Sequence, residues 1–134
     1  MKKVIVLIIS VFFTVSAFGQ GMYEITQKSL EEKQIELKLL DHDIKIEVLF
    51  VRTGGLNSIL DSIYKDKCAR YDKMIKIYTQ YVTKVEALIN ENSMHLTVDE
   101  NESLLESIEY IKLLIESAEG ALNLLEVTLK YADN

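Results

Sequence analysis

The chain has 134 residues, of which 21 are Asp or Glu and 15 are Lys or Arg, so its formal net charge is −6. This acidic balance disfavours direct binding to nucleic acid and docking on anionic lipid, because both depend on basic side chains that neutralise phosphates. Cys68 is the only cysteine, which excludes a disulfide within the chain and leaves apolar packing to hold the fold together.

The first residues have the pattern of an export signal. Two lysines precede the apolar run VIVLIISVFF, and Ala17 and Gly19 occupy the small-residue positions of a signal-peptidase site. We predict a signal peptide over 1–19, cleaved between Gly19 and Gln20, and a periplasmic or secreted product. The alternative is an uncleaved N-terminal anchor, although the run is shorter than the about 20 apolar residues that a membrane span needs.

Cleavage would leave 115 of the 134 residues, a length that fits a single domain over 20–134 with a modest core. Because two lysines leave with the signal, the remainder would carry 13 basic and 21 acidic residues, a formal charge of −8. We expect no stable membrane insertion after cleavage.

The first segment of the mature chain is compatible with two secondary structures. Apolar residues alternate in IELKLLDHDIKIEVLFV (Ile35–Val51), as in a hairpin, but Leu30, Leu37, Leu40, Ile44, Val48 and Val51 also share one face of a helix. The central Asp-His-Asp lacks the glycine or asparagine that tight hairpin turns favour, and KSLEEKQIELK upstream is strongly helix-forming. We predict a helix over about 24–52, broken or kinked at Gly54-Gly55.

The second segment carries one regular apolar stripe, with steps of 4 and 3 residues that are typical of packed helices. The stripe comprises Tyr64, Cys68, Tyr71, Ile75, Tyr78, Val82, Val85 and Ile89. It predicts a helix over about 56–91, in which Cys68 is a buried thiol.

The third segment repeats this spacing in Leu104, Ile108, Ile111, Ile115, Ala118, Leu122, Leu125 and Leu129. Thr97 and Glu100 fit a capping box, which predicts a helix over about 98–131. A second stripe runs beside the first and comprises Tyr110, Leu114, Ala121, Leu124 and Tyr131. Two stripes indicate contact with more than one neighbour, as in a bundle rather than a two-stranded coiled coil. The fold class is therefore all-α, with three long antiparallel helices in an elongated bundle.

The sequence offers no pattern of catalytic or metal-binding residues. His42 and His95 have no imidazole or thiol three or four residues away, and Asp41-His42-Asp43 cannot converge on a metal while helical. We find no nucleophile with a base and an orienting group, and no glycine-rich phosphate loop. We therefore predict no enzyme, no cofactor and no metal site, with His95 exposed in the loop before the third helix.

Five tyrosines form the candidate partner surface: Tyr64, Tyr71, Tyr78, Tyr81 and Tyr110. The first three are seven residues apart on one stripe, and tyrosine is enriched where the binding energy of interfaces concentrates. The alternative is packing at the edge of the core, with the hydroxyl groups reaching water.

Residues 77–129 contain IYTQYVTKVEALI, a polar loop, and LTVDENESLLESIEYIKLLIESAEGALNLLEVTL. This stretch resembles the small exported conjugal transfer proteins of the TraI type that conjugative transposons of gram-negative anaerobes encode. The likeness lies in Tyr81-Val82-Thr83, in Thr97 to Glu100, and in Leu113-Leu114 to Ser117. The resemblance implies an accessory component of a DNA-transfer apparatus that acts by contact and carries no catalytic residues.

The sequence thus favours an exported, non-catalytic helical protein that binds a protein partner or a second copy of itself, as an accessory part of a conjugative transfer or secretion complex. The alternative is a stand-alone periplasmic binding, inhibitor or immunity module that masks its partner through an acidic helical surface.

Overall fold

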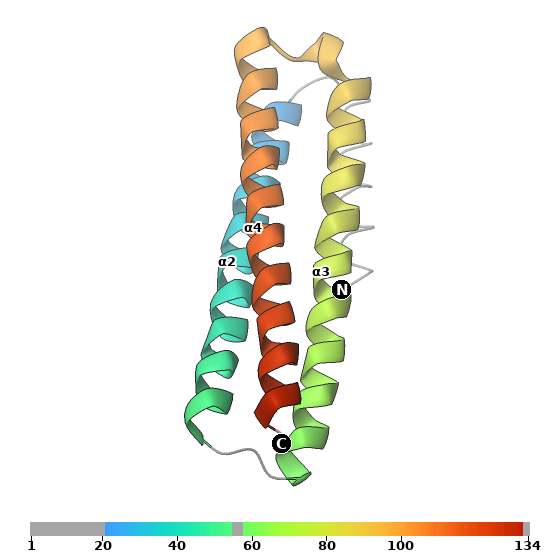
Figure 1. Ribbon diagram of the computed structural model, residues 1–134. Coiled ribbons are helices and arrows are strands. Elements are labelled where there is room, and N and C mark those ends of the chain that lie inside the picture. The colour runs from blue at the N-terminus through green and yellow to red at the C-terminus, as the bar shows by residue number, and fades with distance from the viewer. Residues whose placement is uncertain (1–20, 55–57, 133–134) are drawn as a thin grey trace.

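The computed structural model describes residues 21–54 and 58–132, so the predicted signal peptide, its cleavage site and Gly55 lie outside the described residues. The described part is helical and contains no strand: α2 spans Met22–Gly54, α3 spans Ser58–Glu91 and α4 spans Val98–Ala132 (Figure 1). A single 3-10 turn, Ser93–His95, lies between α3 and α4. The predicted all-α class with three long helices is confirmed, and Ile35–Val51 is helix rather than hairpin.

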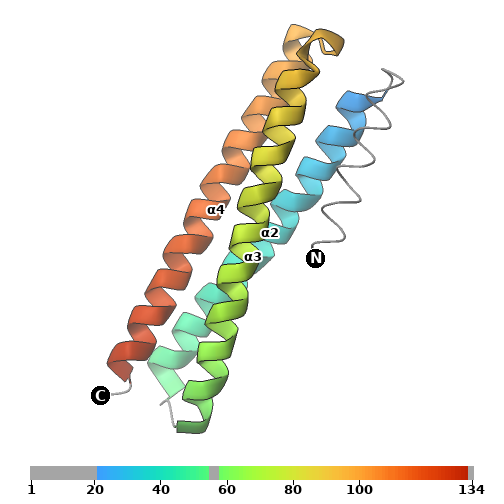
Figure 2. The same ribbon diagram turned by 90° about the vertical axis from the view of Figure 1, so that its right-hand side faces the viewer.

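Consecutive helices run in opposite directions along one long axis, so α2 and α4 point the same way, with α2 inclined to the other two (Figure 2). α4 is the central element because it packs along both α2 and α3, whereas the backbones of α2 and α3 approach each other at few points. The prediction that the third helix has two neighbours is confirmed. Of its second predicted stripe, however, Tyr110, Leu124 and Tyr131 are exposed rather than buried against either neighbour.

Side-chain size accounts for the unequal spacing of the helices. α4 presents two serines to α2: the Ser117 hydroxyl donates to Asp41 at 2.9 Å, and Ser103 accepts from the Tyr23 hydroxyl at 3.2 Å. Short side chains at a helix contact let the two backbones approach closely. Between α2 and α3, by contrast, long side chains bridge the gap, as in the 2.8 Å ion pair of Lys67 with Glu47.

The core contains the predicted stripe of α3, the first predicted stripe of α4 and the predicted face of α2. All members of the first α4 stripe are buried, and so are those of the α3 stripe except Tyr71, which is half-buried. On α2 the six residues assigned to one helical face, from Leu30 to Val51, are at most 5% exposed. Cys68 is buried, as predicted.

The capping box at the start of α4 is also confirmed. The backbone N–H of Glu100 donates to the Thr97 hydroxyl at 3.1 Å, and the backbone N–H of Thr97 donates to the Glu100 carboxylate at 2.9 Å. These two bonds satisfy N–H groups that have no partner inside the helix, and so fix where α4 begins.

Candidate interaction surfaces

The five tyrosines of the candidate surface do not share one face of the molecule. Tyr64, Tyr78 and Tyr81 lie in the core, with exposed fractions of 3%, 7% and 0%. Tyr71 is half-buried beside them, and Tyr110 is 40% exposed on α4. Of the five, Tyr110 is therefore the most exposed, although the Lys38 ammonium of α2 lies 5.2 Å from the centre of its ring.

Two of the buried tyrosines belong to a polar cluster between α2 and α3. The Tyr81 and Ser29 hydroxyl groups are hydrogen-bonded, and the Tyr78 hydroxyl donates to the Glu36 carboxylate at 3.1 Å. The ammonium group of Lys33, which is 5% exposed, lies 2.9 Å from the same carboxylate and 5.6 Å from the centre of the Tyr81 ring. Each member of the cluster thus has a partner, as burial of polar groups requires.

Burial shapes the proton affinity of this cluster. It raises the pKa of Tyr81 to about 12, although the bond to Ser29 opposes the shift, and burial together with the Glu36 charge raises that of Tyr78. Both hydroxyl groups therefore stay protonated near neutral pH, where they serve as hydrogen-bonding links between the helices.

Cys68 is the other group of chemical interest in the interior. Burial, followed by the nearby carboxylates of Glu126 and Glu47, raises the pKa of the Cys68 thiol to about 11. Because the thiolate is the reactive form, this environment suppresses nucleophilic chemistry at neutral pH.

The Asp41-His42-Asp43 stretch is a turn of α2 whose side chains diverge. Asp41 forms a 2.7 Å ion pair with Lys45, while His42 and Asp43 are exposed. His95 is exposed in the 3-10 turn, as predicted. Within 21–54 and 58–132, no group of three or more potential metal ligands converges.

Opposite its buried stripe, α4 carries exposed apolar side chains between Tyr110 and Tyr131. We call this surface the α4 outer face. It comprises Tyr110, Leu113, Gly120, Leu124, Val127 and Tyr131. Ser117 completes the steps of 3 and 4 residues, but it is half-buried and donates to Asp41 of α2. Its large side chains are 40% to 71% exposed. A methyl group added at Gly120 would meet no atom within 4 Å, so packing within the chain does not require a glycine there.

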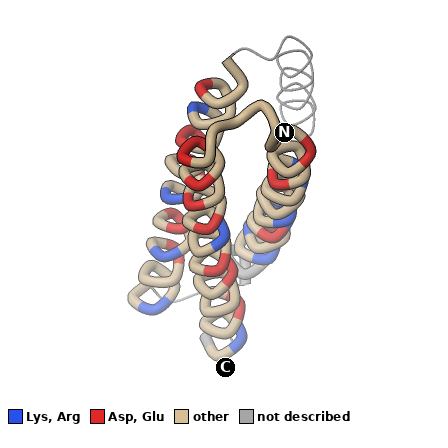
Figure 3. The backbone as a smooth tube through the Cα atoms, turned by 90° about the horizontal axis from the view of Figure 1, so that it is seen from above, with Lys and Arg blue, Asp and Glu red and all other residues tan. Residues whose placement is uncertain are grey.

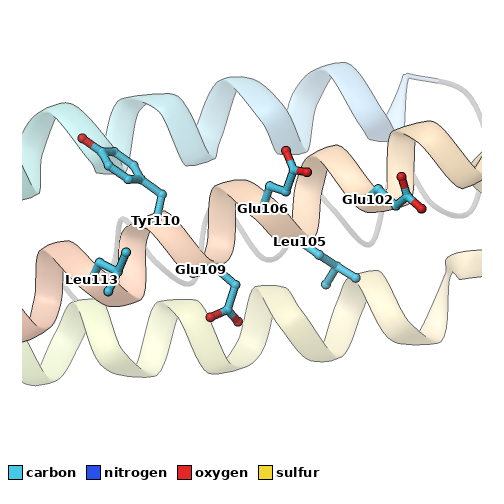
Figure 4. Close-up of a pocket in the computed structure, with 6 residues that line it drawn as sticks. All are labelled: Glu102, Leu105, Glu106, Glu109, Tyr110 and Leu113. Atoms are coloured by element: carbon cyan, nitrogen blue, oxygen red, sulfur yellow. The ribbon is translucent and has the colours of Figure 1, made fainter.

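The N-terminal end of this face is bordered by acidic side chains. Glu102, Glu106 and Glu109 surround an open depression that Leu105, Tyr110 and Leu113 complete (Figure 4). Tyr110 and Glu106 are directed toward the α2 side of α4, and Leu105 and Glu109 toward the α3 side. Acidic positions recur along α4 in the view from above (Figure 3).

α2 also has an apolar surface, which we call the α2 outer face: Ile35, Leu39, Ile46, Leu49 and Phe50. These side chains are 48% to 60% exposed, whereas the core residues of the same helix are at most 5% exposed. This face was not predicted from the sequence, because a helix with two opposite apolar faces has nearly the alternation of a strand. The signal was the 3 and 4 spacing of Ile35, Leu39, His42, Ile46 and Leu49.

Of the helices described, none is both long and apolar enough to cross a membrane. No protein-family model, curated protein or solved structure matches the chain at a significant level.

Proposed function

We propose that the protein is an exported, non-catalytic interaction protein that serves as an accessory component of a conjugative transfer or secretion apparatus. The observation that carries the proposal is the α4 outer face, a row of exposed apolar side chains on the central helix that Ser117 and Gly120 interrupt. Exposed apolar strips with a polar border are typical of surfaces that bind another protein. The export pattern and the resemblance of residues 77–129 to conjugal transfer proteins give the setting.

The chemistry of the strip defines a partner. Apolar side chains at helical spacing receive a second helix laid along them, and the carboxylates of Glu102, Glu106 and Glu109 favour Lys and Arg at its edge. The partner segment is accordingly an amphipathic helix with a basic border. Gly120 would allow close approach at the middle of the contact.

The acidic border also supports a second candidate function, that of a periplasmic inhibitor or immunity module that masks a basic protein. Such a contact would depend chiefly on the three glutamates and would weaken steeply with added salt, because ions screen exposed charges. A contact that depends chiefly on Leu113 and Leu124 would lose much less affinity in salt. The salt dependence of binding therefore separates the two functions.

The experiment for the leading function is deletion of the gene in cells that carry the transfer apparatus, followed by complementation. Deletion should lower the frequency of transfer, and the unaltered gene should restore it. A variant with both Leu113→Asp and Leu124→Asp should fail to restore it, because two charges would be placed on the strip.

The matched control is Ile63→Asp, which puts the same charge on an exposed apolar position of α3. It should restore transfer fully. Transfer that is unaffected by deletion would contradict the proposed setting, and full restoration by the doubly substituted variant would contradict the role of the α4 outer face.

A further inference from the structure

We propose that the α2 outer face is a self-association surface, on which α2 of a second copy of this chain packs in parallel. The inference concerns a different helix from the α4 outer face and does not depend on the proposed function. It starts from spacing: Ile35, Leu39, His42, Ile46 and Leu49 follow steps of 4 and 3 residues, the seam of a two-helix contact. From Ile35 to Phe50 the strip is about 24 Å long at the usual rise per residue.

The two edges of this seam carry opposite charges. Along one edge stand Lys38, Lys45 and Arg52, spaced seven residues apart. Along the other edge stand Glu36 and Asp43, also seven apart and followed by Phe50. All six residues are exposed. Within one chain, Lys38 lies 5.2 Å from the centre of the Tyr110 ring and Lys45 lies 2.7 Å from Asp41, so a second helix would have to draw these ammonium groups to its own carboxylates.

The opposite charges of the two edges favour a second copy of α2 as the partner, in parallel orientation. In a parallel pair of identical helices, one edge of each helix meets the opposite edge of the other, which places Lys38 against Asp43 of the second copy, twice by symmetry. In an antiparallel pair like edges meet, so Lys38 and Lys45 would face each other and like charges would repel. One like-charged contact remains in the parallel pair, Glu31 against Glu36 at its margin, where Lys33 already pairs with Glu36.

His42 occupies the centre of the seam and is exposed in the single chain. In the parallel pair it would face the same residue of the second copy. A polar residue at one core position of a two-helix contact fixes the register and lowers the affinity. His42→Leu should therefore tighten the association.

The first test is sedimentation equilibrium of the purified protein in the form that the cell produces. We expect reversible dimers, with a dissociation constant that Ile46→Asp raises at least about tenfold and His42→Leu lowers about tenfold. Ile63→Asp and Leu113→Asp should leave it unchanged. Because Leu113 belongs to the α4 outer face, loss of partner binding and loss of self-association are separable.

A second test reports the direction of the pair. Leu49→Cys alone and Ile35→Cys alone should each give disulfide-linked dimers on mild oxidation, since equivalent positions meet in a parallel pair. The unaltered chain is the control, because its Cys68 is buried. A monomer at all concentrations, or undiminished dimers of Ile46→Asp, would overturn the proposal. Cross-linking only when the two cysteine variants are mixed would show antiparallel pairing and would overturn it as well.

Discussion

Tyr81 is the largest side chain that the described part of the chain buries completely, and its hydroxyl group is held by Ser29. The ring lies under the ammonium group of Lys33, so one residue joins the apolar core to the polar cluster between α2 and α3. Such a group stabilises the fold only while its hydrogen bond is made, because a buried polar atom without a partner is costly.

Tyr81→Phe should therefore lower the free energy of unfolding by about 1 kcal/mol, since the Ser29 hydroxyl loses its buried partner. Urea unfolding followed by circular dichroism measures this change. Tyr110→Phe is the matched control: the ring is 40% exposed, and we expect a change within about 0.5 kcal/mol. Equal effects at both positions would contradict the assigned burial of Tyr81.

The placement of the tyrosines was only partly predictable at this scale. The sequence put Tyr64, Tyr71 and Tyr78 on one stripe of a helix, which fits either a core or a contact surface. In the structure the rings lie in the core, because the space between α2 and α3 accommodates them. There Ser29 reaches the Tyr81 hydroxyl group and Glu36 reaches the Tyr78 hydroxyl group. The spacing of α2 and α3 arises from the packing of α2 on α4, which local sequence does not encode.

At the scale of the element, α2 explains why one segment favoured two secondary structures. Leu37, Leu40 and Ile44 point into the core, while Ile35 and Leu39 point to the opposite side. On a helix, the side chains of residues i and i+2 point about 200° apart. Two opposite apolar faces therefore give nearly the alternation of a strand. The helix was predictable from the missing turn residues, whereas the outer face became evident only once the core face was known.

The start of α4 gives the sharpest prediction at this scale. Thr97→Ala removes the hydroxyl that accepts from the Glu100 N–H, and should lower the free energy of unfolding by about 1 kcal/mol. Thr83→Ala makes the same change inside α3, where the exposed hydroxyl bonds only to the Thr79 carbonyl at 3.0 Å. Alanine is the better helix former there, so stability should stay equal or rise slightly. A larger loss at Thr83 than at Thr97 would contradict the capping role.

For the whole molecule, the buried hydroxyl and thiol groups set the response to alkali. The ordinary pKa of tyrosine is 10.0, and burial raises that of Tyr64 and of Tyr81 to about 12. That of Cys68 rises from 9.0 to about 11. Since these groups ionise more easily in the unfolded chain, their contribution to stability is complete below about pH 9 and is lost as the pH rises toward 12.

We therefore expect these groups to leave the free energy of unfolding, measured with urea at a series of pH values, unchanged between about pH 7 and 9. Above that range they should lower it steeply. The part of the tyrosinate absorbance that the substitutions Tyr64→Phe and Tyr81→Phe remove should rise together with the loss of helical circular dichroism. If that part rises while the helices remain intact, the burial of these two rings is contradicted.

The positions of the helices were predictable from the sequence, but their pairing was not. Periodicity and capping residues located three helices to within a few residues, because both are local properties. The helix pair with the most extensive packing, α2 with α4, is not adjacent in the sequence, and Ser103 and Ser117 form hydrogen bonds across it. Serines within a helical sequence do not by themselves indicate which helix they contact.

We propose that the protein acts by contact through the α4 outer face, and site-specific photo-cross-linking in the producing cells would detect that contact. A photoreactive amino acid is placed at Leu113, and in a separate strain at Ile63, which is similarly apolar and exposed on α3. The account predicts an adduct with a protein of the transfer or secretion apparatus from position 113 and none from position 63. No adduct at 113, or the same adducts from both positions, would contradict it.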